Sequence, residues 1–419
     1  MKAGIGERVL AASRTRDRVL DAVKAVALLL VIVGHSLAWH VRPDGTAVNV
    51  VEDVPYLIAL TWLFQVLPLF FAAGAVSNAA SLSRHGQMDY LRARGRSLLA
   101  PVVVYASLWT VVLLAFHGSE QVRGAGRFLS QLLWFAGVYL LVAAAAVITT
   151  RWIPHPVLTL GLWLGAIAAF DALRTTDLAA WGWINMLLVW GWLHQCGYYL
   201  PQLKGRRWLA PVGAALIATS VLVAFVGPYS HSLISVAGVP GLSNLAPPSV
   251  VLALYGAGQI LLLAGLWDLL GRLLSRDRLW VVIALIGARG MGMYLWHIPL
   301  VGTAAATVIA TGWTQPPLSG LWWLVHIAVA VVVVPTAWFL AGLVEPVQRR
   351  LLKWRGPVSA PAVGCALGGV AVLNMSATGF ATLTGPGAVG MPSSAILNLG
   401  LVVLAFSLVN SGSPAKAVR

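Results

Sequence analysis

The sequence has little charge and almost no cysteine. Only 10% of its residues are Asp, Glu, Lys or Arg, whereas 59% are hydrophobic. So few charges cannot cover that much apolar surface in water, and the composition therefore excludes a water-soluble domain. The two cysteines, Cys196 and Cys365, lie in apolar segments, which argues against a disulfide framework. Histidine and cysteine are nowhere spaced like metal ligands, so we expect no metal site.

Long hydrophobic runs, by contrast, fill the chain. Stretches of about 18 or more apolar residues recur from end to end, and each is long enough to cross ~30 Å of hydrocarbon. The first run is too long for a cleavable signal peptide, and no small-residue cleavage site follows it. The pattern predicts an all-α, polytopic transmembrane helix bundle of about twelve spans. They cover residues 19–40, 57–79, 97–116, 128–149, 153–170, 180–200, 208–227, 248–271, 279–308, 320–343, 361–382 and 394–411.

Basic residues outnumber acidic ones by 28 to 13, for a net charge of +15. They occur in short clusters between apolar runs, which is typical of orientation signals in membrane proteins and does not indicate nucleic-acid binding. With the N-terminus in the cytoplasm, the outer side receives only Arg42, Arg123, Arg127 and Arg174. This bias predicts a multi-pass protein with both ends in the cytoplasm. The longest outer loop, residues 227–249, is uncharged, and we expect it to pack as an irregular or re-entrant segment over the bundle.

The first predicted span, "RVLDAVKAVALLLVIVGHSLAW", carries ionisable side chains inside its apolar run. Lys24 and His35 are 11 residues apart, just over three helical turns. Both side chains therefore point the same way within about 20° and are separated by roughly 16 Å along the axis. Asp21 lies near the same face, one turn closer to the cytoplasm. The segment thus predicts a polar stripe that leads from the cytoplasmic mouth to a histidine inside the membrane.

Ionisable groups at such depth are costly unless they face protein or water, which makes them candidates for function. His35 is the candidate general base, because imidazole accepts and returns a proton near neutral pH. Two structural alternatives stay open. Lys24 can extend its charge to the interface, and His35 can form a hydrogen bond to a neighbouring helix.

A second intramembrane cluster lies in the predicted span 279–308. Arg289 and His297 are eight residues apart, just over two turns, and are expected on one face. Arg289 must meet water, a carboxylate or a ligand, since an unpaired guanidinium at this depth is very costly. For Tyr294 the alternatives are an oxyanion donor or core packing, and for His297 a catalytic role or a hydrogen bond between helices. Glu345, farther along the chain, is expected to pair with a basic neighbour.

Several stretches resemble the integral-membrane acyltransferase-3 family, in the order in which that family has them. "RVLDAVKAVALLLVIVGH" is similar to its opening signature and "LFFAAGAVSNAASL" to its second helix. "YLRARGRSLLAPVVVY" resembles its arginine-rich loop, which enters a helix through a proline, here Pro101. "GARGMGMYLWHIPL" and "VEPVQRRLL" resemble its Tyr-Leu-x-His-x-Pro motif and the Glu-Pro ending of its tenth helix. The resemblance covers approximately residues 14–355, and the family usually has arginine where this chain has Lys24.

The resemblance implies an acyltransferase domain in the bacterial cell membrane. It would cover residues 19–355, preceded by a cytoplasmic segment (1–18) and followed by two extra spans (356–411) and a cytoplasmic tail (412–419). The implied reaction is O-acylation, in which an acyl group, in the first instance acetyl, moves from cytoplasmic acyl-CoA to a hydroxyl of a sugar or glycoconjugate. No resident cofactor is implied. The partners are acyl-CoA, a carbohydrate or glycolipid acceptor, and membrane lipids.

The same resemblance implies roles for single residues. His35 would be the general base, with Asp21 and Lys24 organising the polar stripe of its helix.

Arg92, Arg94 and Arg96 would hold the phosphates of CoA on the cytoplasmic side, and Arg289 would join them in donor binding. For the three clustered arginines the alternative is that they serve membrane orientation alone.

A transporter is the competing interpretation. Twelve spans with both ends inside also fit a major-facilitator-type transporter or flippase, and "RHGQMDYLRARGRS" lies where that class has a basic loop. The loop of that class begins with Gly and has Asp-Arg ahead of Gly-Arg-Arg, a pattern that this chain lacks. A second, related half of the chain is also missing. We therefore favour the enzyme and keep the transporter as the alternative.

Overall fold

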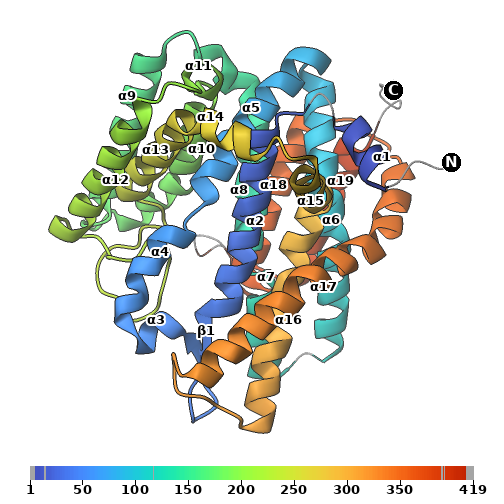
Figure 1. Ribbon diagram of the computed structural model, residues 1–419. Helices are drawn as coiled ribbons and strands as arrows, with labels where there is room; N and C mark the ends of the chain where they lie inside the picture. Colours follow the sequence, from blue (N-terminus) through green and yellow to red (C-terminus); the bar gives the residue numbers. More distant parts are fainter. Residues whose placement is uncertain (1–4, 14–15, 117, 388–389, 391, 412–419) are drawn as a thin grey trace. The chain divides into compact units, whose positions relative to one another are not determined.

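The structure is a computed structural model that describes residues 5–13, 16–116, 118–387, 390 and 392–411. The predicted cytoplasmic tail, 412–419, lies outside these residues, as does Arg14 of the predicted N-terminal segment. The longer helices are α2 (Arg18–Ala38), α5 (Leu67–His85), α6 (Gln87–Ala115), α8 (Leu133–Thr149), α9 (Pro156–Leu173), α12 (Leu209–Val226), α13 (Val250–Gly265), α16 (Gly290–Thr311), α17 (Gly320–Lys353) and α18 (Pro361–Thr378) (Figure 1). The shorter ones are α1 (Ile5–Ala12), α3 (Val50–Asp53), α4 (Ile58–Phe64), α7 (Glu120–Ser130), α10 (Asn185–Gly197), α11 (Leu200–Leu203), α14 (Trp267–Leu273), α15 (Asp277–Ala288) and α19 (Ala395–Val409). Strands β1 (Trp39–Val41) and β2 (Ala47–Asn49) form one antiparallel hairpin, and β3 (Gly385–Pro386) and β4 (Pro392–Ser393) form another.

The predicted all-α polytopic bundle is confirmed, whereas the count of about twelve spans stays a prediction. In the described part of the chain, nine helical segments are long and apolar enough to cross a membrane, or ten if the bent pair α13–α14 forms one span. Two predicted spans account for the difference. Residues 180–200 form a 3₁₀ turn and the 13-residue α10, and residues 394–411 contain the 15-residue α19. Helices of this length extend only about 20–23 Å, which is less than the hydrocarbon thickness.

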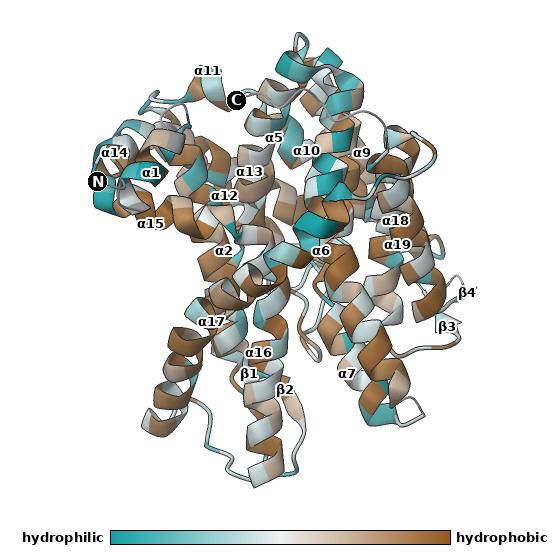
Figure 2. Ribbon diagram, turned by 90° about the vertical axis from the view of Figure 1, so that its right-hand side faces the viewer, coloured by the Kyte–Doolittle hydropathy of each residue, from teal (hydrophilic) through white to brown (hydrophobic). Residues whose placement is uncertain are grey.

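Hydrophobic residues lie along most helices (Figure 2). On α9, Val157 is 87% exposed and Leu162 is 68% exposed. Large exposed apolar side chains of this kind mark a surface that contacts lipid.

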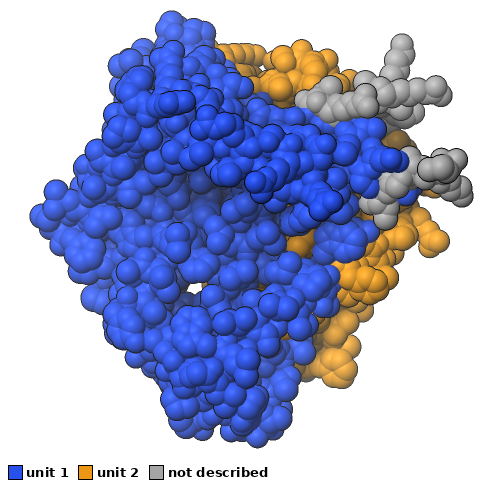
Figure 3. All heavy atoms as spheres, viewed as in Figure 1, with its two compact units in different colours: residues 1–76, 152–290, 303–338 blue, residues 77–151, 291–302, 339–419 orange. Residues whose placement is uncertain are grey.

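The chain forms two compact units that interleave along the sequence (Figure 3). Unit 1 comprises residues 1–76, 152–290 and 303–338, and unit 2 comprises residues 77–151, 291–302 and 339–419. The long helices α5, α16 and α17 each contribute residues to both units.

In unit 1, α12 and α13 pack side by side through small residues (Figure 1). A Cβ at Gly213 would lie 2.5 Å from the main-chain nitrogen of Leu262, and one at Gly258 would lie 2.8 Å from the main-chain oxygen of Gly213. Only glycine permits such backbone approach. Close contact through small residues is the usual means by which helices associate in lipid, where apolar side chains gain nothing from leaving the solvent.

In unit 2, α18 packs against α8, and α19 packs against α6 (Figure 1). A Cβ at Gly137 of α8 would lie 2.7 Å from the main-chain oxygen of Gly369, and one at Gly95 of α6 would lie 2.4 Å from the side chain of Val409. The two C-terminal helices, α18 and α19, therefore pack closely against α8 and α6 in unit 2, because glycine leaves room for the approach.

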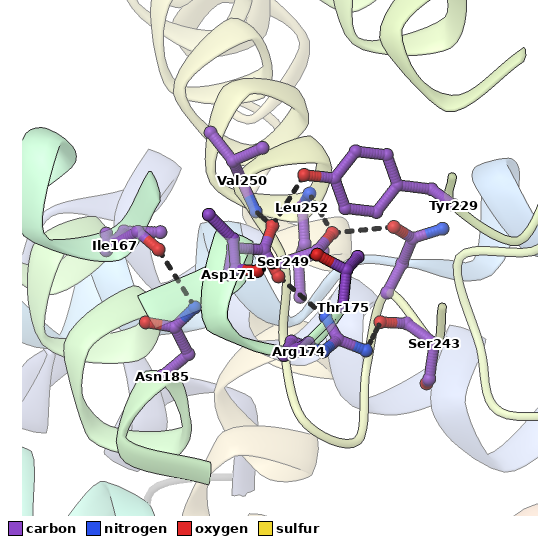
Figure 4. Close-up of polar contacts among 12 residues, drawn as sticks. Ile167, Asp171, Arg174, Thr175, Asn185, Tyr229, Ser243, Ser249, Val250 and Leu252 are labelled. Carbon is purple, nitrogen blue, oxygen red and sulfur yellow. Dashed lines mark hydrogen bonds and ion pairs between the residues drawn. The ribbon is translucent and has the colours of Figure 1, made fainter. Parts of the chain in front are cut away.

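The outer loop 227–249 is irregular, as predicted, and a buried polar network holds it in unit 1 (Figure 4). Asp171 and Arg174 form an ion pair of 2.7 Å with side chains only 1% and 5% exposed. The other carboxylate oxygen of Asp171 accepts hydrogen bonds from the Tyr229 hydroxyl at 2.8 Å and from the Val250 amide at 2.9 Å. Arg174 also donates to the main-chain oxygen of Ser243 at 2.8 Å. Burial, together with the Asp171 charge, raises the pKa of Tyr229, so its hydroxyl stays a donor.

Candidate active site

Helix α2 carries the predicted polar stripe without interruption. It begins after Asp17, whose side chain accepts hydrogen bonds from the amides of Val19 and Leu20, and it continues through His35. Its buried residues follow helical spacing and include Val19, Ala22, Ala25, Leu28, Ile32 and Ser36. Lys24 and His35 lie off this buried row and are partly exposed. Because the helix is continuous, both side chains project from nearly one face, as the spacing predicts.

The His35 ring is oriented by its own helix. Nδ1 lies 2.7 Å from the main-chain oxygen of Val31. An oxygen acceptor there requires the proton on Nδ1, which puts the lone pair of the neutral ring on Nε2. The neighbouring Ser36 donates to the Ile32 oxygen at 2.8 Å and is fully buried, so it points elsewhere. In the neutral ring, Nε2 is therefore the atom that can accept a proton.

At the end of the stripe that is predicted to face the cytoplasm, the carboxylate of Asp21 pairs with Arg16 at 2.6 Å. Arg18 forms a second ion pair, at 2.8 Å, with Asp277 at the start of α15. Asp21 therefore has a cationic partner on the preceding segment.

Beside His35, the segment α4–α5 is broken. A Cβ on Gly34 would lie 3.1 Å from the Phe64 ring, which places the end of α4 against α2. The chain leaves the helix at Gln65, so the carbonyls of Trp62 and Gln65 need other donors. Tyr255 donates to the first carbonyl, and Gln259 donates to the second at 2.9 Å. Irregular backbone within a membrane span is tolerated here because side chains of α13 donate hydrogen bonds to the carbonyls that the helix leaves unpaired.

Helix α4 also lines an open pocket with a volume of about 490 Å³. The aromatic rings of Tyr56, Trp62 and Phe225 lie in its wall, and the His231 ring stacks on Phe225 with 4.0 Å between the ring centres. The Trp62 indole donates to the main-chain oxygen of His231 at 2.9 Å and so ties α4 to the outer loop. The pocket is apolar and aromatic with a few polar groups, a composition typical of sites for small organic ligands.

The prediction that Arg289 and His297 share one helix face is wrong. The predicted span 279–308 is interrupted at Arg289, where α15 ends with φ −115° and ψ 13°, and α16 begins at the next residue. The Arg289 guanidinium lies 3.7 Å from the centre of the Trp338 ring and donates to the Trp338 main-chain oxygen at 3.3 Å. The face of an indole stabilises a cation electrostatically. In unit 1, the Arg289 guanidinium therefore contacts the aromatic ring of Trp338. The sequence had indicated that it would contact water, a carboxylate or a ligand.

Tyr294 and His297 lie on the part of α16 that belongs to unit 2. The Tyr294 hydroxyl donates to the main-chain oxygen of Leu132 at 2.7 Å, and its ring lies 5.1 Å from that of Phe135. His297 is fully buried, with Nδ1 3.3 Å from the Met293 oxygen. The Tyr294 contacts are those of a packed core and favour its structural alternative. The Met293 contact of His297 lies within α16 and does not decide between its alternatives. The oxyanion role of Tyr294 and the catalytic role of His297 stay predictions.

Arg92, Arg94 and Arg96 lie within α6, although the sequence indicated a loop. Residues two apart on a helix differ by about 200°, so Arg94 points away from Arg92 and Arg96, which are only about 40° apart. Arg92 pairs with Asp89 at 2.7 Å. Arg94 donates to the Ser77 oxygen at 3.3 Å and covers the Tyr90 ring at 5.7 Å. The helix brings two of the three arginines together, not all three.

Glu345 forms the expected ion pair, with Arg349 at 2.5 Å. The helix does not end beside it as the resemblance implied, because α17 continues as far as Lys353.

A charged cluster that the sequence did not indicate follows α2 directly. Arg42 of the β1–β2 hairpin donates to both carboxylate oxygens of Asp53, and its shortest contact is 2.7 Å. His40 Nε2 lies 3.7 Å from the same carboxylate. The hydrogen bonds from Arg42 hold the pKa of Asp53 below its usual value, and burial lowers the pKa of His40. The Asp-Gly pair of "RPDGT", where Gly45 has φ +82°, was the available signal for the hairpin turn.

The chain matches the model of the acyltransferase-3 family, described as an acyltransferase domain, over residues 17–342. The matched segment is more than three quarters of the chain, and the protein belongs to this family. It is a multi-pass membrane acyltransferase, an enzyme that transfers acyl groups other than aminoacyl groups to sugar-type substrates. The match confirms the resemblance and decides for the enzyme over the transporter alternative. No curated protein and no solved structure matches the chain.

Proposed function

We propose that the protein moves an acetyl group from cytoplasmic acyl-CoA to a hydroxyl of a sugar or glycoconjugate at the bacterial cell membrane, with His35 as general base. The observation that carries the proposal is the orientation of His35. Its Nδ1 is held by the Val31 oxygen, which leaves Nε2 as the basic atom on a continuous membrane helix. A base of this kind must keep one nitrogen protonated while the other accepts the substrate proton.

The reaction balances with this one base. His35 Nε2 takes the proton of the acceptor hydroxyl as its oxygen attacks the thioester carbon, and a carbon–oxygen bond forms. The carbon–sulfur bond then breaks, and the proton on His35 passes to the departing CoA thiolate. Neutral imidazole is regenerated without any further reactant.

Other charged residues are proposed to have supporting roles. Lys24 and Asp21 are proposed to organise the polar stripe that leads to His35, with Asp21 balanced by Arg16. Arg92 and Arg96, which share one face of α6, are proposed to bind donor phosphates as guanidinium forks do. Arg94 points the other way and is proposed to stabilise the helix through Ser77 and Tyr90.

The aromatic pocket beside α4 is the proposed location for the acceptor sugar. Sugar rings present apolar C–H faces that pack against aromatic rings, while their hydroxyls bond to polar groups at the rim. Tyr56 is 73% exposed at this pocket, so truncating it removes a wall without opening the core. Tyr56→Ala should raise the acceptor KM several-fold and leave the donor KM unchanged.

Acyl transfer tests the proposal directly. Membranes with the full-length protein receive labelled acetyl-CoA and a panel of sugar acceptors, with His35→Ala beside Ser36→Ala. General-base catalysis contributes about 10²–10⁴-fold, so His35→Ala should lose that factor while Ser36→Ala keeps most of the rate. Wild-type transfer by His35→Ala would overturn the role of the histidine. Failure of the wild type to transfer from acyl-CoA to any acceptor would overturn the reaction.

A further inference from the structure

Two arginines from distant parts of the chain converge in unit 2. Arg96 of α6 donates to the main-chain oxygen of Leu352 at 3.4 Å, and Arg355 donates to the same oxygen at 3.1 Å. The two guanidinium groups are close enough for their positive charges to repel each other. Arg92, on the same face of α6 as Arg96, donates to Ser359, four residues beyond Arg355. The segment around Arg355 therefore lies along the arginine-bearing face of α6.

The C-terminal helices hold Arg355 in this place. Asn410, at the end of α19, accepts a hydrogen bond from Arg355 at 3.2 Å and donates to the main-chain oxygen of Trp354. A Cβ on Gly356 would lie 2.1 Å from the Ser407 oxygen, so the chain touches the backbone of α19 there. The Ala360 amide donates to the Leu408 oxygen at 3.2 Å. Contacts on both sides of Arg355 thus fix it against the end of α19.

Bringing two like charges together costs free energy unless something compensates for them. Among the described residues, no acidic side chain forms an ion pair with Arg96 or Arg355. Main-chain oxygens and the Asn410 amide satisfy some of their N–H groups but carry no net charge. An anion would offset the repulsion, and the planar donor fork of arginine matches phosphate oxygens in pairs.

We infer that Arg355 joins Arg96 in binding a phosphate group of the acyl-CoA donor, and that α19 positions it there. The inference rests on the proposed use of acyl-CoA. Arg355 lies beyond the family match, which ends at residue 342, and so does the whole C-terminal pair of helices. The C-terminal helices thereby have a proposed role in donor binding, because the last residues of α19 hold the Arg355 side chain against α6.

Donor binding, measured apart from turnover, tests the inference. The full-length protein in detergent is titrated with acetyl-CoA by calorimetry, as wild type, Arg355→Gln, Arg355→Lys and Arg350→Gln. Arg350 is the matched control, since it is exposed on the last turn of α17 and its loss changes the net charge equally. Loss of a charge-assisted contact should weaken binding about tenfold in Arg355→Gln, less in Arg355→Lys, and hardly at all in Arg350→Gln.

A variant that keeps every charge tests the positioning role. Gly356→Ala must shift the segment away from Ser407, so it should weaken acetyl-CoA binding although no charge is lost. Wild-type affinity in this variant would overturn the positioning by α19.

The two proposals fail in different ways. Equal affinities of Arg355→Gln and Arg350→Gln, alongside tight wild-type binding, would overturn the role of Arg355 and leave the proposed donor intact. Absence of acetyl-CoA binding to the wild type would overturn both. Thermal unfolding of each variant, compared with the wild type, separates lost binding from lost structure.

Discussion

The His326 ring joins the start of α17 to the end of α2 through the main chain of Trp39. Nε2 lies 2.9 Å from the Trp39 oxygen, and Nδ1 lies 2.8 Å from the Trp322 oxygen. The ring also stacks between the two indoles, with 3.9 Å between its centre and that of Trp322 and 4.4 Å to that of Trp39. The neutral ring carries one proton and donates to one of these two oxygens. It anchors α2 four residues after His35.

Removing this anchor should destabilise unit 1 and slow the reaction. His326→Phe keeps a ring beside the indoles but removes the donor of the main-chain oxygen to which the imidazole donates, which costs about 1–3 kcal/mol for a buried group. We expect a lower unfolding temperature in detergent and a reduced kcat, because the end of α2 that carries His35 is less constrained. His155→Phe, an exposed histidine before α9, is the control. Equal unfolding temperatures for the two variants would contradict this prediction.

The buried ion pair under the outer loop should be sensitive to loss of one charge. Asp171→Asn leaves the Arg174 guanidinium, 5% exposed, without its carboxylate. Breaking one side of such a pair typically costs about 3–5 kcal/mol. We expect a clear fall in unfolding temperature and faster proteolysis within residues 227–249. Asp177→Asn, at an exposed site a few residues later, removes the same charge and should leave both measurements at wild-type values.

The cluster after α2 predicts how stability depends on pH. Burial lowers the pKa of His40 from its usual 6.5, so the unfolded chain binds the proton more readily than the folded one. The stability that the neutral ring contributes is complete above pH 6.5 and is lost as the pH falls below it. The lowered pKa of Asp53 acts in the same direction at lower pH, below its usual value of 3.8.

Acidification from pH 8 to pH 5.5 should therefore lower the unfolding temperature of the wild type more than that of His40→Gln. At these pH values Asp53 stays ionised in both proteins, so the difference reports His40 alone. An identical pH dependence of the two proteins would show that His40 does not contribute.

The sequence predicted correctly which side chains share a face of one continuous helix. It predicted poorly the arrangements that depend on where a helix ends and the next one begins. Asp21, Lys24 and His35 lie on the continuous α2, so counting turns placed them correctly. The same count failed for Arg289 and His297, because it assumed one helix where the backbone changes direction at Arg289. Hydropathy does not register such a break, since both flanking segments are apolar. No local pattern indicated the role of Arg355, because Asn410 and Arg96, which lie beside it, are far from it along the chain.

The three arginines of α6 provide the last prediction, because helix geometry assigns them different roles. Arg96 shares its face with Arg92 and lies beside Arg355, whereas Arg94 is directed to the Ser77 oxygen and the Tyr90 ring. Arg96→Gln should raise the KM for acetyl-CoA about tenfold with little change in kcat, since it removes ground-state donor binding. Arg94→Gln should lower the unfolding temperature and leave that KM unchanged.

High salt should separate the two arginines further. Screening weakens an exposed contact with donor phosphates, so the wild-type KM should rise with ionic strength and the Arg96→Gln KM should rise less. The Arg94→Gln variant should keep the full salt dependence of the wild type. A rise in KM of similar size in both variants would mean that all three arginines act on the donor, and it would reject the division of roles that the continuous helix α6 implies.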